Sequence, residues 1–178
     1  LVPGTFELGV KTAQGIDGPL FLGMDPHALS EPAHAVTLEV LAANGVEVRY
    51  QSGSGFTPTP VISRAILAHN RSAGTARADG VVITPSHNPP DNGGFKYNPP
   101  HGGPADADVT GWIQDRANRL LEDRLAGVRR ITLDAALRSE SVSAIDFVEP
   151  YVEGLARVLA LPALRASRLR LCVPPLCL

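Results

Sequence analysis

Short apolar runs and longer periodic stretches alternate along the chain. The runs at 19–24, 46–50 and 81–84 are brief and bounded by turn residues, which predicts buried strands. Between and after them, apolar residues recur at spacings of three and four, as on one face of a helix. Strands that alternate with helices predict an α/β layered domain. The predicted helical faces are Leu29, Ala33, Val36, Val40 and Ala43; Ile62, Ala65, Ile66 and His69; Val109, Ile113, Ala117 and Leu120; and Val148, Val152, Leu155 and Leu159.

Capping and turn residues predict where these elements begin and end. A side-chain oxygen at the start of a helix can accept a hydrogen bond from a free backbone N–H group. Gly45 can end the first helix in a left-handed conformation, and residues 132–137 predict one short helical turn. Alternating apolar residues at 169–173 predict a last strand. The candidate capping residues are Ser30, Thr59, Asp106 or Asp108, and Asp146.

Composition narrows the class of protein. The chain has 178 residues and a net charge of −2, which gives no sign of a nucleic-acid or membrane-surface partner. No apolar run approaches the roughly 18 residues of a membrane span. The two cysteines lie together near the end, so we expect a reducing cytoplasm rather than a disulfide framework. The first residues do not read as a signal peptide, and the absence of an initial Met suggests a piece of a longer chain.

The stretch that carries the most chemistry follows the strand at 81–84. Ser86 comes just beyond that strand's carboxyl end, where open α/β sheets place their ligands. Turn residues at 91–94 predict that the chain reverses and brings Lys96 back toward Ser86. A hydroxyl, the imidazole of His87 and an ammonium group in one small region suit phosphoryl transfer, because cations offset the charge that the hydroxyl accepts.

Each of these residues also has a plainer interpretation. Ser86 could simply end a strand and form a hydrogen bond within a turn. His87 could be a loop histidine held by hydrogen bonds to the backbone, and Lys96 could be solvated at the edge of a hairpin. A serine hydrolase is disfavoured, because no Gly-x-Ser-x-Gly surrounds Ser86. Asp25 and His27 follow another strand end, so they either border the same cleft or have a surface role.

The amino-acid sequence of this stretch resembles that of a known protein family. Thr84-Pro-Ser-His-Asn-Pro89 with Gly93-Gly-Phe-Lys-Tyr-Asn98 is similar to the phosphoserine loop of the α-D-phosphohexomutases, and the resemblance runs from about 20 to 173. It implies a layered α/β/α domain with a mixed sheet at 1–145, incomplete at its N-terminus. Residues 146–178 would then form a connecting helix and the first strand of a truncated second domain.

The resemblance also implies a chemistry. In this family a serine gives its phosphoryl group to one hydroxyl of a hexose phosphate and takes it back from another, through a bisphosphorylated sugar. Mg2+ would contact the phosphate on Ser86, and glucose 1,6-bisphosphate would be the activator. A lysine at the position of Lys96 is the proposed general acid or base. The implied residues are catalytic Ser86, His87 and Lys96, and substrate-binding Asn88, Thr57 and Thr59.

Several family motifs are missing from the sequence. The N-terminal Thr-Ser-Gly-x-Arg-Gly motif and the Asp-Gly-Asp-Gly-Asp-Arg metal loop are absent, and His27 stands where many members have arginine. We therefore expect the chain alone to be inactive, and a non-catalytic sugar-phosphate-binding domain stays open as an alternative. The segment 98–104 favours a glucose phosphate over mannose or glucosamine phosphates. A missing strand would leave a sheet edge through which copies could associate.

Overall fold

A mixed sheet forms the middle of the protein in the computed structural model, which describes residues 11, 15–72, 74, 76–167 and 170. In the described part, five strands lie in the order β4-β3-β1-β2-β5. Four are parallel, and β4 runs antiparallel to β3 at one edge. The predicted mixed sheet is confirmed. The strands are β1 (Leu20–Met24), β2 (Val48–Gln51), β3 (Asp79–Ile83), β4 (Lys96–Asn98) and β5 (Val142–Ile145).

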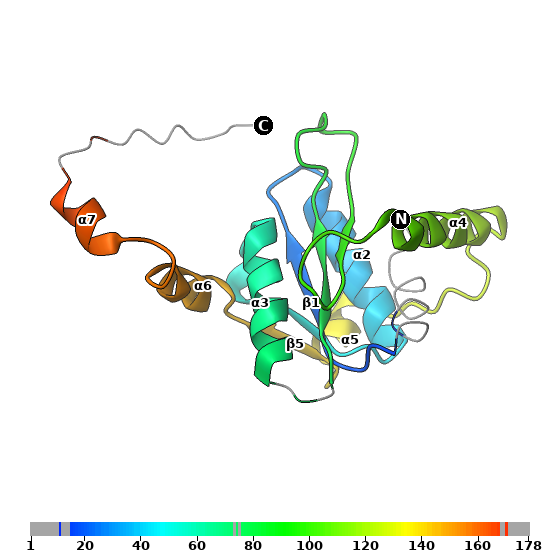
Figure 1. Ribbon diagram of the computed structural model, residues 1–178. Helices are drawn as coiled ribbons and strands as arrows, with labels where there is room; N and C mark the ends of the chain where they lie inside the picture. The colour runs from blue at the N-terminus through cyan, green and yellow to red at the C-terminus, as the bar shows by residue number, and fades with distance from the viewer. Residues whose placement is uncertain (1–10, 12–14, 73, 75, 168–169, 171–178) are drawn as a thin grey trace.

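Helices cover both faces of this sheet, which confirms the predicted α/β/α layers (Figure 1). One face carries α2 (Ser30–Ala43) and α5 (Leu133–Leu137), and the other carries α3 (Thr59–Ser72), with α6 (Val148–Leu155) packed beside α3. Two further helices, α4 (Ala107–Glu122) and α7 (Leu161–Ala166), extend to the sides. A 3-10 turn at Ser52–Ser54 follows β2. No helix in the described ranges is long and apolar enough to cross a membrane.

The central strands are buried on both faces. Leu20, Leu22 and Met24 of β1 pack on the side of α2, while Phe21 packs on the side of α3. Successive side chains of a strand point to opposite faces, so a strand covered on both sides favours apolar residues at most of its positions. This preference explains why β1 and β3 appear in the sequence as continuous apolar runs.

The helix α2 spans the predicted residues, and its buried face includes Ala33 and Val40 as predicted but is rotated away from Leu29. Ser30 does not cap it, because its buried hydroxyl donates to the Asp25 carboxylate, with the Ile83 carbonyl oxygen 3.3 Å away. Leu29, predicted to face the core, is 37% exposed. The sheet and α5 both contact this helix, and their position selects the buried face. Gly45 ends the helix with a left-handed φ of 71°, as predicted. The buried residues are Ser30, Ala33, Thr37, Leu38, Val40 and Leu41.

The later helices are more exposed than predicted. Of the stripe expected on α4, Leu120 alone is buried, and the helix ends before the predicted Gly127. No residue of α6 is buried, so its predicted core stripe is wrong for this chain. Asp146 does accept hydrogen bonds from the first backbone N–H groups of α6, as a cap should. Of the strand predicted at 169–173, only Arg170 lies within the described residues.

A buried ion pair fastens the segment before β1 to the first residue of β3, at the amino end of the two strands. Lys11 Nζ lies 2.7 Å from the Asp79 carboxylate, whose other oxygen accepts from the Tyr97 hydroxyl at 3.0 Å. Burial raises the pKa of Asp79, and the lysine and the hydroxyl partly offset that effect. Pattern reasoning assigned no role to Lys11, because a lone lysine in a weakly patterned segment gives no signal of burial.

Candidate active site

Ser86 lies in the loop between β3 and β4, at the carboxyl end of the sheet (Figure 1). Its side chain is exposed, and its φ of 72° is left-handed, which residues other than glycine rarely adopt. Its backbone N–H donates to Thr84 Oγ1 at 3.1 Å, and the N–H of His87 donates to the Pro85 carbonyl at 3.1 Å. These bonds hold the serine in a strained conformation, a feature found at functional sites.

Asp25, just after β1, anchors this loop. Its carboxylate accepts hydrogen bonds from the side chains of Ser30 and Thr84, and from the backbone N–H of His27 at 3.0 Å. Burial raises the pKa of Asp25, but these hydrogen bonds outweigh it and hold the pKa below its usual range. Thr84 therefore links an ionised carboxylate to the N–H of Ser86.

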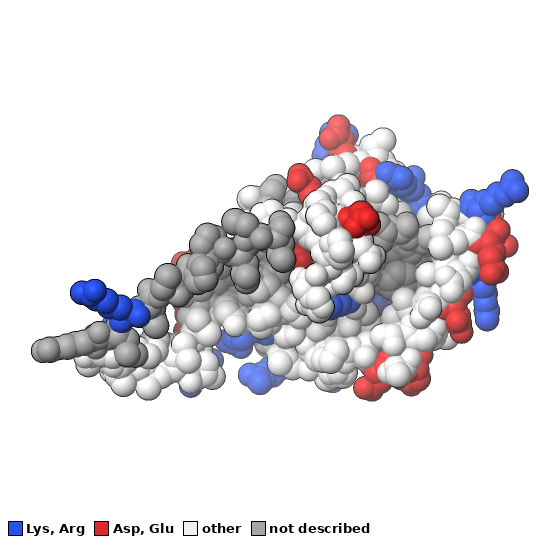
Figure 2. Space-filling view, turned by 90° about the horizontal axis from the view of Figure 1, so that it is seen from above, with Lys and Arg blue, Asp and Glu red and all other residues white. Residues whose placement is uncertain are grey.

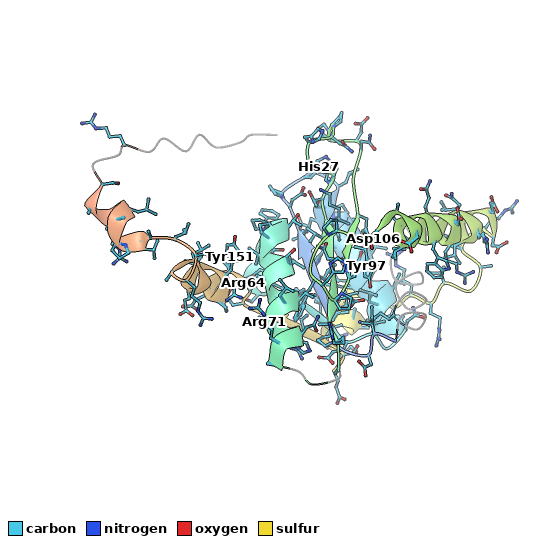
Figure 3. The ribbon with its side chains drawn as sticks, viewed as in Figure 1. His27, Arg64, Arg71, Tyr97, Asp106 and Tyr151 are labelled. Carbon is cyan, nitrogen blue, oxygen red and sulfur yellow. The ribbon has the colours of Figure 1, made fainter. Side chains whose placement is uncertain are left out.

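His27 braces the far side of the same loop and lies beneath it in Figure 3. Its Nε2 is 3.0 Å from the Pro89 carbonyl, and its Nδ1 is 3.3 Å from the Leu29 backbone N–H. Because Nδ1 accepts that N–H, we assign the ring proton to Nε2, which donates to Pro89. This histidine therefore touches the loop that carries Ser86.

The structure brings Ser86 and His87 together. His87 Nδ1 lies 3.2 Å from Ser86 Oγ, and both side chains are exposed to solvent. In the tautomer with the ring proton on Nε2, Nδ1 accepts the serine O–H. A base in that position can take the proton as the hydroxyl oxygen attacks an electrophile. The pair can therefore activate a nucleophile that a dissolved substrate can reach.

Lys96 does not join this pair. The predicted chain reversal forms, because the N–H of Thr84 donates to the Gly94 carbonyl at 3.0 Å. Lys96 lies opposite Val82, four positions before Ser86 along β3 and its loop, and is exposed on the sheet face that carries α3. Within the described residues no hydrogen bond joins it to Ser86, so a role for Lys96 in proton transfer stays a prediction.

The three predicted substrate-binding residues lie in different settings. Thr57 is fully buried, and its hydroxyl accepts from the Met24 backbone N–H at 3.2 Å, so it supports the end of β1. Thr59 is the first residue of α3 and is partly exposed, as is Asn88 in the Ser86 loop. Neither of the last two makes a side-chain hydrogen bond to another described residue. Their contact with a substrate stays a prediction.

The acidic residues near the loop do not make a metal site. The part of the chain that the structure describes contains no group of three or more His, Cys, Asp or Glu side chains that could hold a metal ion. Asp25 already accepts three hydrogen bonds. Mg2+ takes near-ideal octahedral geometry and is usually held by one or two carboxylates together with phosphates and waters. The described residues therefore do not fit a Mg2+ site, even with a phosphate on Ser86.

Sequence reasoning missed Thr84 and Ser30, the two hydroxyl groups that complete the Asp25 network. A signal for Thr84 was present. Asp25 and Thr84 directly follow β1 and β3, which are neighbours in the sheet. Since parallel strands end at the same edge, polar residues just after two neighbouring strands are expected to meet. Ser30 gave no comparable signal, because a serine at a helix start usually caps that helix.

Comparison with known proteins assigns the family. A family model described as phosphoglucomutase/phosphomannomutase, α/β/α domain I, matches residues 8–124 of the 178 in this chain. The chain belongs to the phosphoglucomutase/phosphomannomutase family. This confirms the resemblance seen in the sequence. Members of this family use Mg2+.

Two curated relatives of this family show how far the likeness extends. The phosphoglucomutase of Komagataeibacter xylinus is 52% identical over 166 residues, which are 93% of this chain and 30% of that protein. Phosphoglucomutase 1 of Drosophila melanogaster is 30% identical over 150 residues, 78% of this chain and 26% of that protein. The chain therefore spans between about a quarter and a third of the length of these relatives.

Solved structures of the family share the fold. The open form of parafusin, a phosphoglucomutase from Paramecium, superposes with a TM-score of 0.66 over 92% of this chain and 32% of that one, at 22% identity. A phosphoglucomutase/phosphomannomutase family protein from Burkholderia thailandensis has a TM-score of 0.56 and 27% identity over 88% of this chain and 30% of that one. The layered domain is thus the fold of this family's domain I.

Proposed function

We propose that this chain carries the phosphoryl-accepting serine of a phosphoglucomutase. The whole enzyme would interconvert glucose 1-phosphate and glucose 6-phosphate, an isomerase reaction of carbohydrate metabolism, through glucose 1,6-bisphosphate. The observation that carries this proposal is the Ser86 loop itself. A strained, exposed serine lies beside an imidazole at the carboxyl end of the sheet, and Asp25 and His27 in the segment after β1 hold its loop in place. The 52% identity to the Komagataeibacter xylinus phosphoglucomutase favours glucose phosphates over other hexose phosphates.

The residues of the chain take distinct parts in the proposed transfer. Ser86 Oγ attacks a phosphorus atom of the sugar bisphosphate while His87 Nδ1 accepts its proton, and the sugar oxygen leaves with the bonding electron pair. Asp25 and Thr84 keep the Ser86 N–H fixed during the attack. The sugar would approach along a path lined by Asn88, Thr59 and the loop that Thr57 supports. Lys96 would offset the phosphate charge from the edge of the hairpin.

We propose Mg2+ as the cofactor of the longer protein. A phosphate on Ser86 would offer it oxygen ligands, and its remaining ligands would come from outside the described residues. The proposed transfer to Ser86 assigns no role to the metal, because the described residues do not complete a site for it. Glucose 1,6-bisphosphate is the proposed activator, since it would phosphorylate the free Ser86 hydroxyl.

We also propose a boundary between two domains at residues 145 and 146. β5 ends at Ile145, and no residue of α6 or α7 is buried. The helices that follow Ile145 would then belong to a second domain. Residues 1–145 would be domain I of the longer enzyme.

Two properties of the whole molecule complete the proposal. The sheet ends in β4 and β5, and an edge strand leaves backbone groups available for pairing with another copy. We propose weak self-association through such an edge. A cytoplasmic setting is proposed because a Mesembryanthemum crystallinum relative, 32% identical over 129 residues, is a cytoplasmic phosphoglucomutase.

The proposed half-reaction can be tested by following its product. The chain, mixed with glucose 1,6-bisphosphate and Mg2+, should release about one equivalent of glucose monophosphate per chain, seen by phosphorus NMR. Ser86→Ala should release none, and His87→Gln should release it more slowly. Equal release by the wild type and Ser86→Ala would overturn the proposal.

A further inference from the structure

A groove between α3 and α6 is lined by positive charge and by no acidic residue. Its volume is about 440 Å3, within the range of small-molecule clefts. Three arginines line it, together with Tyr151, and none of its lining residues belongs to the Ser86 loop or its braces. Figure 3 shows Arg64 and Tyr151 where the two helices face each other, with Arg71 further along α3. The arginines are Arg64, Arg71 and Arg157.

These arginines are not neutralised by the chain as described. The ion pairs among the described residues involve Lys11, Arg49 and Arg130, and none of the three groove arginines. Arg64 is the informative member, because it is partly buried and none of its donors is paired with a described residue. A guanidinium group has five N–H donors, and leaving them unpaired in a partly buried place costs free energy.

The backbone of α6 leaves room for Arg64. A Cβ atom at Gly154 would lie 2.8 Å from Arg64 Nε and 2.8 Å from Nη2, closer than real Cβ contacts. The guanidinium therefore lies directly against α6, at the wall of the groove. Arg64 and Arg71 are seven positions apart, which places them two turns apart on one face of α3. Basic side chains are also visible at the lower edge, left of centre, on the side of α3 and α6 (Figure 2).

We propose that this groove is a second anion site that binds a phosphate group, distinct from the Ser86 loop. Phosphate fits better than a single carboxylate, because it offers three oxygens and close to two charges to several guanidinium groups at once. Guanidinium donors match such oxygens in bidentate pairs. The phosphate can be inorganic or part of a small organic ester, and both share this chemistry.

Titration of the isotope-labelled chain followed by amide NMR tests the site. Inorganic phosphate and glycerol 3-phosphate should shift amides of α3 and α6 in a saturable way, glycerol should not, and added salt should weaken the effect. Tighter binding of glycerol 3-phosphate would identify an organic ester as the ligand, and equal binding would identify free phosphate. Shifts confined to residues 84–94, or no saturable shift, would overturn the proposal.

Variants separate this site from the general charge of the surface. Arg64→Gln should weaken phosphate binding about tenfold, as expected for the loss of one charged hydrogen-bonding partner. Arg116 is an exposed arginine on α4, and Arg116→Gln should change the affinity for phosphate by less than about twofold. Ser86→Ala should leave it unchanged. If Arg64→Gln does not fold, Arg71→Gln on the helix surface serves instead, and binding equal to that of Arg116→Gln would overturn the proposal.

Discussion

At the scale of single residues, Ser86 has a left-handed backbone, which among the described non-glycine residues it shares with Arg124 and Leu125 in the turn after α4. Its φ is 72°, and a left-handed conformation costs a residue with a side chain about 1–2 kcal/mol. Glycine avoids that cost, although it loses about 0.5–1 kcal/mol more backbone entropy on folding. The strain persists because hydrogen bonds to Thr84 and Pro85 fix the backbone on both sides of the serine peptide.

This strain predicts an ordering of two variants that both lack the hydroxyl. Ser86→Gly should have a free energy of unfolding about 0.5–1 kcal/mol higher than Ser86→Ala, because only glycine relieves the strain. Urea unfolding followed by circular dichroism measures the difference. If alanine were as stable as glycine there, the strained conformation would not be the one that the protein adopts in solution.

A second prediction concerns Asp25. Asp25→Asn should lower the free energy of unfolding at pH 7 by about 0.5–1 kcal/mol, because it weakens hydrogen bonds to an ionised group that solvent partly screens. Folding lowers the pKa of Asp25, so its stabilisation is present above the ordinary value of 3.8 and is lost as the pH falls through the folded pKa. The difference between wild type and variant should therefore shrink below pH 3.8, in unfolding curves measured at several pH values. A difference that stayed constant with pH would contradict this account.

At the scale of elements, the hairpin formed by β3, the Ser86 loop and β4 depends on one close approach. A Cβ atom at Gly94 would lie 2.5 Å from Pro85 Cα and closer still to the Thr84 carbonyl oxygen. Backbone atoms cannot move aside as a flexible side chain can. At the neighbouring Gly93 a Cβ atom would meet only the Leu29 side chain, at 3.4 Å.

The two glycines therefore make a matched pair of variants. Gly94→Ala should lower the free energy of unfolding by about 1–3 kcal/mol, the usual cost of forcing extra atoms into a packed place, and should slow phosphorylation of Ser86. Gly93→Ala should change stability by less than about 0.5 kcal/mol. Thermal unfolding and phosphorylation rates give the comparison, and similar losses at both positions would mean that the close approach is not what shapes the loop.

The elements also show what the sequence could predict. Continuous apolar runs predicted β1 and β3. Because ligands bind at the carboxyl ends of strands in open α/β sheets, the position of Ser86 just after β3 predicted that it lies at the ligand-binding edge. The same rule could have found Thr84. The position of Lys96 could not be predicted, because turn residues indicate a reversal but not the length of the loop. The buried face of α2 and the exposure of α6 escaped prediction because periodicity shows an apolar stripe but not what covers it.

At the scale of the whole molecule, the chain carries a nucleophile without the rest of a catalytic apparatus. The described residues supply no cluster of metal ligands, and the chain spans between about a quarter and a third of the length of its relatives. A single transfer to Ser86 needs only the nucleophile and its base, whereas repeated turnover also needs charge neutralisation and positioning of the sugar for the return transfer. We therefore predict no steady-state conversion of glucose 1-phosphate by the chain alone, in an assay coupled to oxidation of glucose 6-phosphate. Sustained turnover that Ser86→Ala abolishes would contradict this prediction.

The measurement that tests the central claim most directly is phosphosite mapping by mass spectrometry. The folded chain would be incubated with glucose 1,6-bisphosphate and Mg2+, digested and sequenced, with Ser86→Ala treated in parallel. The account predicts a single phosphoryl group on Ser86 of the wild type and none on the variant. A phosphoryl group on another residue, or an unmodified Ser86 in a folded sample, would contradict the claim that this loop accepts the phosphoryl group.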